Sequence, residues 1–318
     1  MENLAFRPEW YDAHGRLLQQ RPACPVLYRA NGAATAAVYP VFTGIHLIFF
    51  DFHCSHVLQE PLFPRPFFQI QHYQQPQVEL EVNDRRVFYL RPEQCCVHSR
   101  EKLPAHCYFP SGRGSGLTLS INPESATENT WRQLATFEID LDALNKRLEL
   151  ERQWYVCRLS PAVQTILDGL YAAKGSDDIC YFRIKALELL HYMSKLGRND
   201  RAVTPYYSRG HVDAVKRIRQ AMLRDLSCKT PLETLLQNEK ISMVTFQAIF
   251  KEIYGFSPYA YLKQYKMKRA AIRLKEENES ISRIAADLGY HNASKFARAF
   301  FDVHGVLPRE YRKQAKGG

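Results

Sequence analysis

The chain has 318 residues, of which 46% are hydrophobic and 24% are charged, and its formal net charge is +10 at pH 7. This length is sufficient for two domains of roughly 150 residues each, and the composition excludes collagen-like and low-complexity proteins. The longest apolar run, residues 45–52, contains His46 and Asp51 and is far shorter than the roughly 20 residues that a membrane-spanning helix needs.

The N-terminus and the cysteines indicate the compartment. The first nine residues carry two acids and no apolar segment of the kind found in a secretion signal. Eight cysteines are scattered without a Cys-x-x-Cys pair, so we expect free thiols and no disulfide framework. We therefore expect a cytoplasmic protein that does not enter a membrane.

The charge is distributed unevenly along the chain. Residues 1–208 hold 22 Lys and Arg against 22 Asp and Glu, whereas residues 209–318 hold 21 against 11. The whole formal net charge therefore belongs to the last third of the chain. Such a basic segment is typical of a protein that binds a polyanion such as a nucleic acid, because Lys and Arg that neutralise phosphates release counterions. A solvated basic surface is the alternative.

Residues 26–120 show the pattern of a β-rich domain. Short runs rich in β-branched and aromatic residues are separated by Pro, Gly and Asn, which is typical of an antiparallel sandwich or barrel. Asn83-Asp84 is expected to be the turn of a hairpin, and the glycine-rich residues 111–116 are expected to be a flexible turn. The predicted strands are residues 39–41, 45–52, 67–73, 78–82, 86–90 and 117–121.

After Glu124 the sequence favours helices. Ser160-Pro161 predicts a helix start, and that helix should extend to about Ala173. A second helix from Ile179 carries an apolar seam with alternating spacings of three and four residues. This seam could pack on a second copy of the chain, or it could face the chain's own core. Its members are Ile179, Phe182, Ala186, Leu189, Met193 and Leu196.

Beyond a linker at residues 197–210, N-cap and C-cap residues delimit a series of helices. Thr230, Pro231 and Glu233 predict a capping box, while Gly255 and Gly305 predict helix ends. The predicted helices are residues 211–226, 231–238, 242–254, 258–277, 281–288, 293–303 and 308–313.

Two of these short helices form a predicted helix-turn-helix unit. The apolar residues of the helix 281–288 form one face, and Phe296 and Phe300 form an apolar face on the next helix. We expect these two faces to pack on each other, with Gly289 in the turn between the helices. The second helix should leave polar positions free to reach bases or phosphates. Its expected exposed and edge positions are Asn292, Ser294, Lys295, Arg298, Ala299 and Asp302.

Three motifs follow one another in this segment: Ile281-Ser282-Arg283-Ile284-Ala285-Ala286-Asp287-Leu288-Gly289-Tyr290, Ser294-Lys295-Phe296-Ala297-Arg298-Ala299-Phe300 and Gly305-Val306-Leu307-Pro308-Arg309-Glu310-Tyr311-Arg312. Together they closely resemble the signature of the AraC/XylS transcription regulators. The resemblance covers about 110 residues. It implies a C-terminal all-α domain, residues 209–318, with two helix-turn-helix units at 231–254 and 281–303 joined by a long helix. It also implies a DNA-binding transcription regulator that binds double-stranded promoter DNA and acts with RNA polymerase, more often as an activator than as a repressor.

The first unit departs from the family pattern. Leu235-Leu236 stands where Leu-Ala is usual, Glu239-Lys240 replaces the glycine turn, and Ala248 replaces a frequent Arg. By resemblance, the second helix of each unit reads the DNA, and Ala248 predicts weaker reading by the first. The predicted DNA-binding residues are Ser242, Val244, Gln247, Ala248, Lys251, Asn292, Ala293, Ser294, Lys295 and Arg298.

The connecting helix, residues 258–277, is roughly 30 Å long at about 1.5 Å per residue. This is close to one turn of B-DNA, so both units could enter successive major grooves on one face. Most of its basic side chains are expected to be solvated, with one or two reaching phosphate. They are Lys263, Lys266, Lys268, Arg269, Arg273 and Lys275.

The resemblance also gives expectations for residues 1–200. They should form a β-rich, cupin-like (jelly-roll) domain with a helical dimerisation segment, so that the whole chain is an α+β protein and a homodimer. The domain is expected to bind an unknown small-molecule effector. The runs 67–92 and 181–190 are similar to the subgroup linked to siderophore-dependent iron acquisition. The residues that could line an aromatic pocket, or simply fill the core, are Phe49, Phe50, Phe52, Phe67 and Phe68.

An enzymatic N-terminal domain is the alternative from another class. A metal-binding cupin needs a His-x-His pair with further ligands, and none of the candidate groups has this spacing. We therefore expect no metal, no cofactor and no catalysis, and the open alternatives are a repressor, a ligand-independent DNA binder, or a metal-cupin enzyme with an attached DNA-binding domain. The candidate groups are His53-x-x-His56, Cys95-Cys96-x-His98 and His106-Cys107.

Overall fold

The computed structural model describes residues 4–5, 26–30, 32–61, 68–75, 77–82, 85–227, 230–276 and 278–316. The chain divides into two compact units, Met1–Tyr206 and Tyr207–Gly318, and each has hydrophobic clusters of its own. Among the helices in the described ranges, none combines the length and the apolar character that crossing a bilayer requires.

Two antiparallel sheets form the centre of the N-terminal unit. One has the strand order β1-β2-β5-β10-β7-β8 and the other the order β12-β9-β6-β11-β4-β3. The prediction of a β-rich N-terminal region is therefore confirmed. The described strands of this unit are β1 (Leu4–Ala5), β2 (Val26–Ala30), β3 (Ala33–Phe42), β4 (Ile45–His53), β5 (His56–Pro61), β6 (Phe68–Gln75), β7 (Val78–Glu81), β8 (Arg86–Leu90), β9 (Gln94–Ser99), β10 (His106–Tyr108), β11 (Gly114–Ile121) and β12 (Tyr155–Arg158).

The two sheets share one apolar core. Ile48 and Phe50 of β4 belong to the same cluster as Leu80 of β7 and Phe88 of β8, and all four side chains are at most 2% exposed. Burial of each such side chain contributes about 1.5–3 kcal/mol. The aromatic rings predicted either to line a pocket or to fill the core thus contribute to packing here, as Phe50 lies 5.0 Å from Phe52 between ring centroids.

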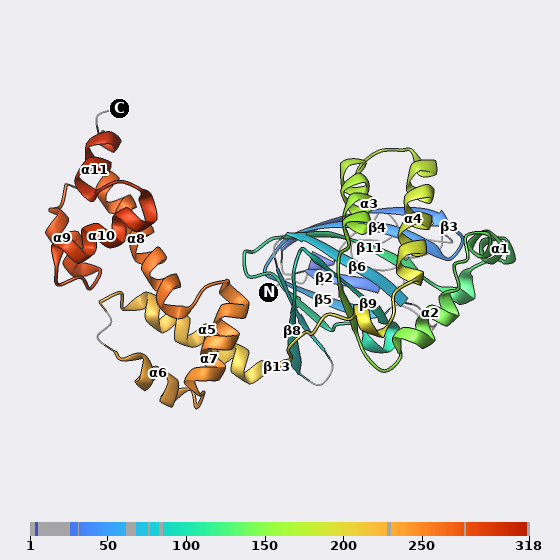
Figure 1. The fold of residues 1–318 in the computed structure, drawn as a ribbon, viewed down its shortest axis with the longest axis horizontal. Coiled ribbons are helices and arrows are strands. Elements are labelled where there is room, and N and C mark those ends of the chain that lie inside the picture. The colour runs from blue at the N-terminus through green and yellow to red at the C-terminus, as the bar shows by residue number, and fades with distance from the viewer. Residues whose placement is uncertain are drawn as a thin grey trace. The chain divides into compact units, whose positions relative to one another are not determined.

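A second core lies between the β4-containing sheet and the helices. Leu47 and Phe49 of β4 pack in a cluster with Leu189 of α4, on the side opposite to Ile48 and Phe50. Because both faces of β4 are covered, its apolar residues are continuous and do not alternate. In Figure 1, α3 and α4 lie side by side along this sheet. The helices are α1 (Glu128–Thr136), α2 (Leu141–Leu148), α3 (Pro161–Ala172) and α4 (Ile179–Ser194).

The apolar seam of α4 faces this second core. Phe182, Ala186, Leu189 and Met193 are at most 2% exposed and belong to the cluster with β4. Of the two uses that the sequence left open, the structure therefore favours packing within the chain. Outside this seam, α4 presents Ile184 and Tyr192 to solvent, which are 63% and 38% exposed.

The glycine-rich segment differs in part from its prediction. Residues 110–112 form a turn, in which the Gly112 N–H donates to the Phe109 carbonyl, but residues from Gly114 onward belong to β11, which pairs with β4 and β6. At Gly116 a Cβ atom would lie 2.2 Å from the carbonyl oxygen of His72, so the glycine permits a close approach of backbone within the sheet. Phe67 and the predicted turn Asn83-Asp84 lie outside the described residues.

The described C-terminal unit is helical, and each predicted helix is confirmed to within three residues at either end. One cap differs. Pro231 itself occupies the N-cap of α6, without a side-chain cap, so the box predicted from Thr230 and Glu233 does not form. After β13 (Tyr207–Ser208), the elements are α5 (Arg209–Arg224), α6 (Leu232–Asn238), α7 (Met243–Tyr254), α8 (Pro258–Glu276), α9 (Ile281–Asp287), α10 (Ala293–His304) and α11 (Pro308–Lys316).

The turns after α6 and α9 have the same backbone geometry. Gly289 is left-handed, with φ of +79°, and its N–H donates to the Ala286 carbonyl at 2.9 Å. Lys240 is left-handed as well, with φ of +52°, and donates to the Gln237 carbonyl at 3.1 Å. The first unit therefore keeps the turn of the second although it lacks the glycine.

We predict that Gly289→Ala destabilises the C-terminal unit more than Gly305→Ala does. Both glycines are left-handed, which costs a non-glycine residue roughly 1–2 kcal/mol. A Cβ at Gly289 would also lie 3.0 Å from the Leu226 carbonyl oxygen, whereas one at Gly305 meets nothing within 4 Å. Hydrogen exchange of residues 281–304 in the full chain measures the difference. Equal effects of the two substitutions would contradict the role of crowding at Gly289.

We further predict that the N-terminal unit loses stability between pH 6.5 and pH 4. Burial lowers the pKa of His98 from 6.5 to about 4. The unfolded chain therefore binds a proton that the folded chain does not, and the loss on acidification reaches about 3 kcal/mol. Urea unfolding followed by tryptophan fluorescence at several pH values should show a flatter pH dependence for His98→Gln. An unchanged slope would exclude His98 as its origin.

Candidate nucleic-acid interface

The C-terminal unit contains two helix pairs of the same design, α6–α7 and α9–α10. In each pair the second helix has 12 residues, begins after a polar N-cap and ends at a left-handed glycine. Equivalent positions lie 50 residues apart, since the N-caps are Ser242 and Asn292 and the glycines are Gly255 and Gly305. The chain thus builds one helix-turn-helix geometry twice.

Two buried phenylalanines anchor each second helix. Phe246 and Phe250 of α7 are 0% exposed, and so are Phe296 and Phe300 of α10. Their ring centroids lie 5.3 Å apart in α7 and 6.0 Å apart in α10. Because each pair is spaced by four residues, it fixes one face of its helix to the core and leaves the opposite face in solvent.

On α7 the exposed face holds the residues that the sequence predicted. Gln247, Ala248 and Lys251 are exposed, and Val244 is 79% exposed. Ser242 is exposed but also acts as the N-cap, since its Oγ accepts from the Thr245 N–H at 3.1 Å. The face therefore offers one amide, one ammonium group and two apolar side chains.

On α10 the exposed face is more basic. Ala293, Ser294, Lys295 and Arg298 are all exposed. Asn292 is exposed and caps the helix, because its Oδ1 accepts from the Lys295 N–H at 3.0 Å. An ammonium and a guanidinium group on one short helix are suited to phosphate oxygens and base edges.

One predicted exposed position of α10 is wrong. Ala299 is only 7% exposed and packs in a cluster with Ala285, Phe296 and Phe300. It follows Phe296 by three residues, which places it on the same side of the helix as the two phenylalanines. A small side chain at this position permits the close packing of α9, α10 and α8.

The connecting helix α8 uses half of its six basic side chains within the unit. Lys266 is 8% exposed, and its ammonium lies 5.6 Å from the ring centroid of Tyr290. Lys263 donates to Asp302 of α10 at 2.6 Å, and Arg273 pairs with Asp287 at 2.9 Å. The three basic residues of α8 that remain exposed are Lys268, Arg269 and Lys275.

The Lys263–Asp302 ion pair joins α8 to α10. The Lys263 hydrogen bond holds the pKa of the Asp302 carboxyl below its usual value, and the charge of Arg298 acts in the same direction. Asp302 is therefore paired with Lys263 close to the proposed DNA-facing residue Arg298. Nothing in the sequence indicated this pair, because its members are 39 residues apart.

Arg217 and Arg219 of α5 contact the first helix pair and the start of α8. Arg217 forms a two-pronged ion pair with Glu239, with distances of 2.7 and 3.0 Å to the two carboxylate oxygens of that side chain. Arg219 donates to the hydroxyl of Tyr261 at 2.7 Å through Nε. These two arginines stabilise the unit, so they add little to the charge available for a polyanion.

The metal candidates of the N-terminal unit do not assemble. His56 and His106 lie on paired strands, with their ring nitrogens 2.8 Å apart. Within the described ranges, no group of three or more His, Cys, Asp or Glu side chains is arranged to hold a metal ion. The six described cysteines are free, and five of them are buried.

Comparison with known proteins assigns the C-terminal unit. A protein-family profile described as "Helix-turn-helix domain" matches residues 235–314. Residues 235–314 are therefore a helix-turn-helix domain. The matched range includes both recognition helices and all of α8, so the predicted second unit and the less typical first unit belong to one domain.

Part of this chain is similar to curated transcription regulators. The chain is 28% identical over 156 residues to the HTH-type transcriptional activator CfaD of Escherichia coli, covering 49% of this chain and 57% of CfaD. It is 33% identical over 90 residues to a putative AraC-like transcription regulator of Streptomyces lividans, covering 28% of this chain and 30% of that protein. The chain thus spans about half the length, or less, of these relatives.

Two solved structures are also similar to parts of this chain. The C-terminal domain of AraT from Geobacillus stearothermophilus is 29% identical, covers 32% of this chain and 84% of that domain, and has a TM-score of 0.30. ToxT from Vibrio cholerae O395 is 10% identical, covers 89% of this chain and 100% of ToxT, and has a TM-score of 0.33. Because both scores are below 0.5, the assignment of the helix-turn-helix domain depends on the family match alone.

We predict that Arg298→Ala and Lys295→Ala each weaken DNA binding by about 1–3 kcal/mol, because each removes a cation that can bond a base edge or a phosphate. Fluorescence anisotropy with a labelled target duplex at fixed salt measures the loss. Arg158→Ala, which removes an exposed arginine of the N-terminal unit, is the matched control. If both substitutions leave the affinity of the folded protein unchanged, α10 is not the contact helix.

Proposed function

We propose that the chain is a transcription regulator that recognises promoter DNA through two helix-turn-helix units. The supporting observation is the repetition of one geometry at a 50-residue interval, with the same helix length, the same buried phenylalanine pair and the same left-handed glycine. One such helix pair could be a packing motif. Two helix pairs joined by one connecting helix can place their recognition helices in successive major grooves of duplex DNA.

The length of α8 supports a bipartite contact. Its 19 residues span about 28 Å at 1.5 Å per residue, which is comparable to the roughly 34 Å turn of B-DNA. The proposed contacts are the ten residues predicted from the sequence, with Ser242 and Asn292 contributing mainly by orienting the first turn of each recognition helix.

We propose that the N-terminal unit binds a small-molecule effector and that the functional species is a homodimer that acts with RNA polymerase in the cytoplasm. A cupin-like jelly roll is the proposed topology of the two sheets. Since the seam of α4 is used internally, we place the dimer contact on the other side of that helix, near Ile184. The likeness to regulators of siderophore-linked iron acquisition stays a prediction, and the relatives named above give it no support. We assign no catalytic role and no cofactor to this protein.

The two recognition helices should contribute unequally. Arg298 on α10 corresponds to Ala248 on α7, so only the second unit carries a guanidinium at this position. We predict that Ala248→Arg raises the affinity for DNA and increases the salt dependence of binding by about one counterion. Titrations at several salt concentrations measure both. Tighter binding without a steeper salt dependence would contradict a new phosphate contact.

Selection of genomic fragments by the purified full-length protein at physiological salt tests the function itself. Non-specific binding is weak there, so an enriched motif with two half-sites about 10 base pairs apart would support bipartite recognition. Transcription from the enriched promoters, with and without the protein, distinguishes an activator from a repressor. Uniform retention of all fragments would contradict sequence-specific regulation.

A further inference from the structure

The N-terminal unit contains a basic pocket that the DNA-binding function does not use. It has a volume of about 590 Å³, within the range of small-molecule sites. Four separate segments form its wall: the β7–β8 hairpin, the turn before β10, the start of β12 and residues 201–206. Its apolar wall is part of the core between the sheets, because Leu103, Trp154 and Val156 belong to the same cluster as Phe50 and Phe52.

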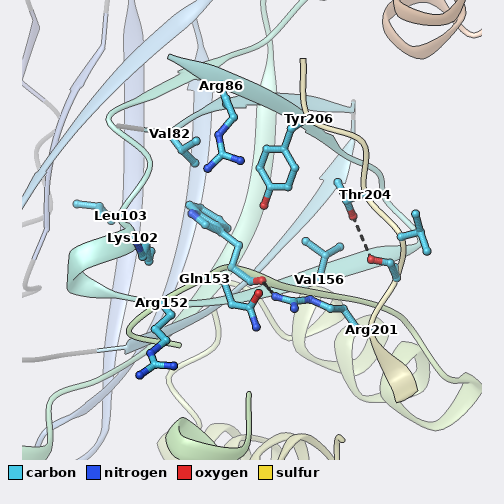
Figure 2. Close-up of a pocket in the computed structure, with 13 residues that line it drawn as sticks. Val82, Arg86, Lys102, Leu103, Arg152, Gln153, Val156, Arg201, Thr204 and Tyr206 are labelled. Atoms are coloured by element: carbon cyan, nitrogen blue, oxygen red, sulfur yellow. Dashed lines mark hydrogen bonds between the residues drawn. The ribbon is translucent and has the colours of Figure 1, made fainter. Parts of the chain in front are cut away.

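The charge of this pocket has one sign. Arg86, Lys102, Arg152 and Arg201 line it, and no Asp or Glu is among the described residues of its lining. In Figure 2, Arg86 lies beside Tyr206 on one edge, while Arg152 and Arg201 lie on the opposite edge with Gln153 between them. This concentration of positive charge is local, because residues 1–208 as a whole carry equal numbers of acidic and basic side chains.

Two of these cations have no acidic partner among the residues that the structure describes. Neither Lys102 nor Arg152 forms an ion pair with a residue in the described part of the chain. Glu149 accepts from Gln153 Nε2 at 2.9 Å, but it pairs with Arg198 and is not part of the pocket wall. Like charges that face one cavity without a counterion destabilise the folded state, and a bound anion removes that repulsion.

The remaining wall is apolar. Leu103, Trp154 and Val156 are at most 6% exposed and form part of the pocket lining. The indole N–H of Trp154 is buried and has no hydrogen-bond partner among the described residues. The Trp154 ring packs edge-on against Phe88, with ring centroids 5.0 Å apart, so the indole gives the wall apolar surface.

Two of the four cations, Arg201 and Arg86, are held in place by their surroundings. Arg201 donates to the backbone carbonyl of Trp154, and the Ala202 N–H donates to the Val156 carbonyl at 2.7 Å. The guanidinium of Arg86 lies 4.9 Å from the ring centroid of Tyr206, which in turn packs on Phe88. Such preorganisation lowers the entropy cost of binding.

We infer that this pocket binds an organic carboxylate with an apolar body. Guanidinium groups bind a carboxylate through paired charge-assisted hydrogen bonds. The apolar part of the ligand packs on Leu103, Trp154 and Val156. The assignment of this ligand as the effector depends on the proposed function, whereas the binding itself does not.

The test compares acids with neutral analogues on the full-length protein. Thermal unfolding and calorimetry are measured with 2-naphthoate and octanoate, with their amides, and with inorganic phosphate. We expect at least one acid to bind and raise the melting temperature, with its amide and phosphate at least tenfold weaker. Binding of neither acid, equal binding of acid and amide, or phosphate as strong as the acids overturns the inference.

A double substitution locates the site. Lys102→Gln with Arg152→Gln should weaken binding of the acid at least tenfold and, without ligand, should leave the fold intact or more stable. Arg113→Gln with Arg158→Gln makes the same charge change at exposed positions outside this pocket and should leave the affinity unchanged. Equal losses in the two double variants would place the ligand elsewhere.

DNA binding separates the two proposals. If the bound acid changes the affinity for the selected promoter in the wild type and not in the pocket variant, the pocket is the effector site. If the acid binds but promoter affinity stays the same, its role as effector is excluded while the anion site stands. Failure to select any promoter would contradict the proposed function, and the calorimetric result would be unaffected.

Discussion

The arrangement of the C-terminal unit depends on α8, because this helix takes part in the packing of both helix pairs. Tyr261 near its start contacts Phe250 of the first pair, with ring centroids 5.4 Å apart. Met267 and Leu274, further along, are 0% exposed in the cluster that contains Phe296. A helix buried at both ends cannot change its length or its rotation without opening a core. The separation of the two recognition helices is therefore fixed by packing.

The same packing decides which side chains are free for DNA. Each recognition helix has one buried face and is left with one exposed face, and the exposed faces differ in charge. The face of α10 carries Lys295 and Arg298, while that of α7 carries Lys251 as its ammonium group. The chain's net charge of +10 overstates the charge available for binding, because Lys263, Arg217 and Arg273 are paired within the unit. Recognition then depends on a few exposed cations and on their geometry.

The N-terminal unit follows a different principle, since one of its sheets is covered on both faces. The β4-containing sheet takes part in the core between the sheets and in the core beneath α3 and α4. This leaves little room for a ligand between the sheets. The pocket lined by Arg86, Lys102, Arg152 and Arg201 lies instead at an edge of the sheet, where residues 201–206 pass beside β12. A pocket at the edge can gather charged side chains, because part of each remains in water.

Local sequence signals determined much of this protein. Caps, glycines and apolar periods gave the helices of residues 209–318 nearly to the residue, and the exposed faces of α7 and α10 followed from the spacing of their phenylalanines. These are short-range effects, in which a residue interacts with neighbours three or four positions away. Where such a signal was ambiguous, the prediction was less reliable. Ala299 was predicted to be exposed, although its spacing from Phe296 places it in the core.

Only the tertiary structure decided the remaining features. Lys240 adopts the left-handed turn expected of glycine, because the packing of Leu236 and Ile241 stabilises that turn. The seam of α4 faces its own sheet, the pair of Lys263 with Asp302 joins two helices, and four distant segments bring their cations into one pocket. Each depends on contacts between residues far apart in the chain. The sequence alone determined which elements form and which faces are polar, and long-range packing determined what those faces meet.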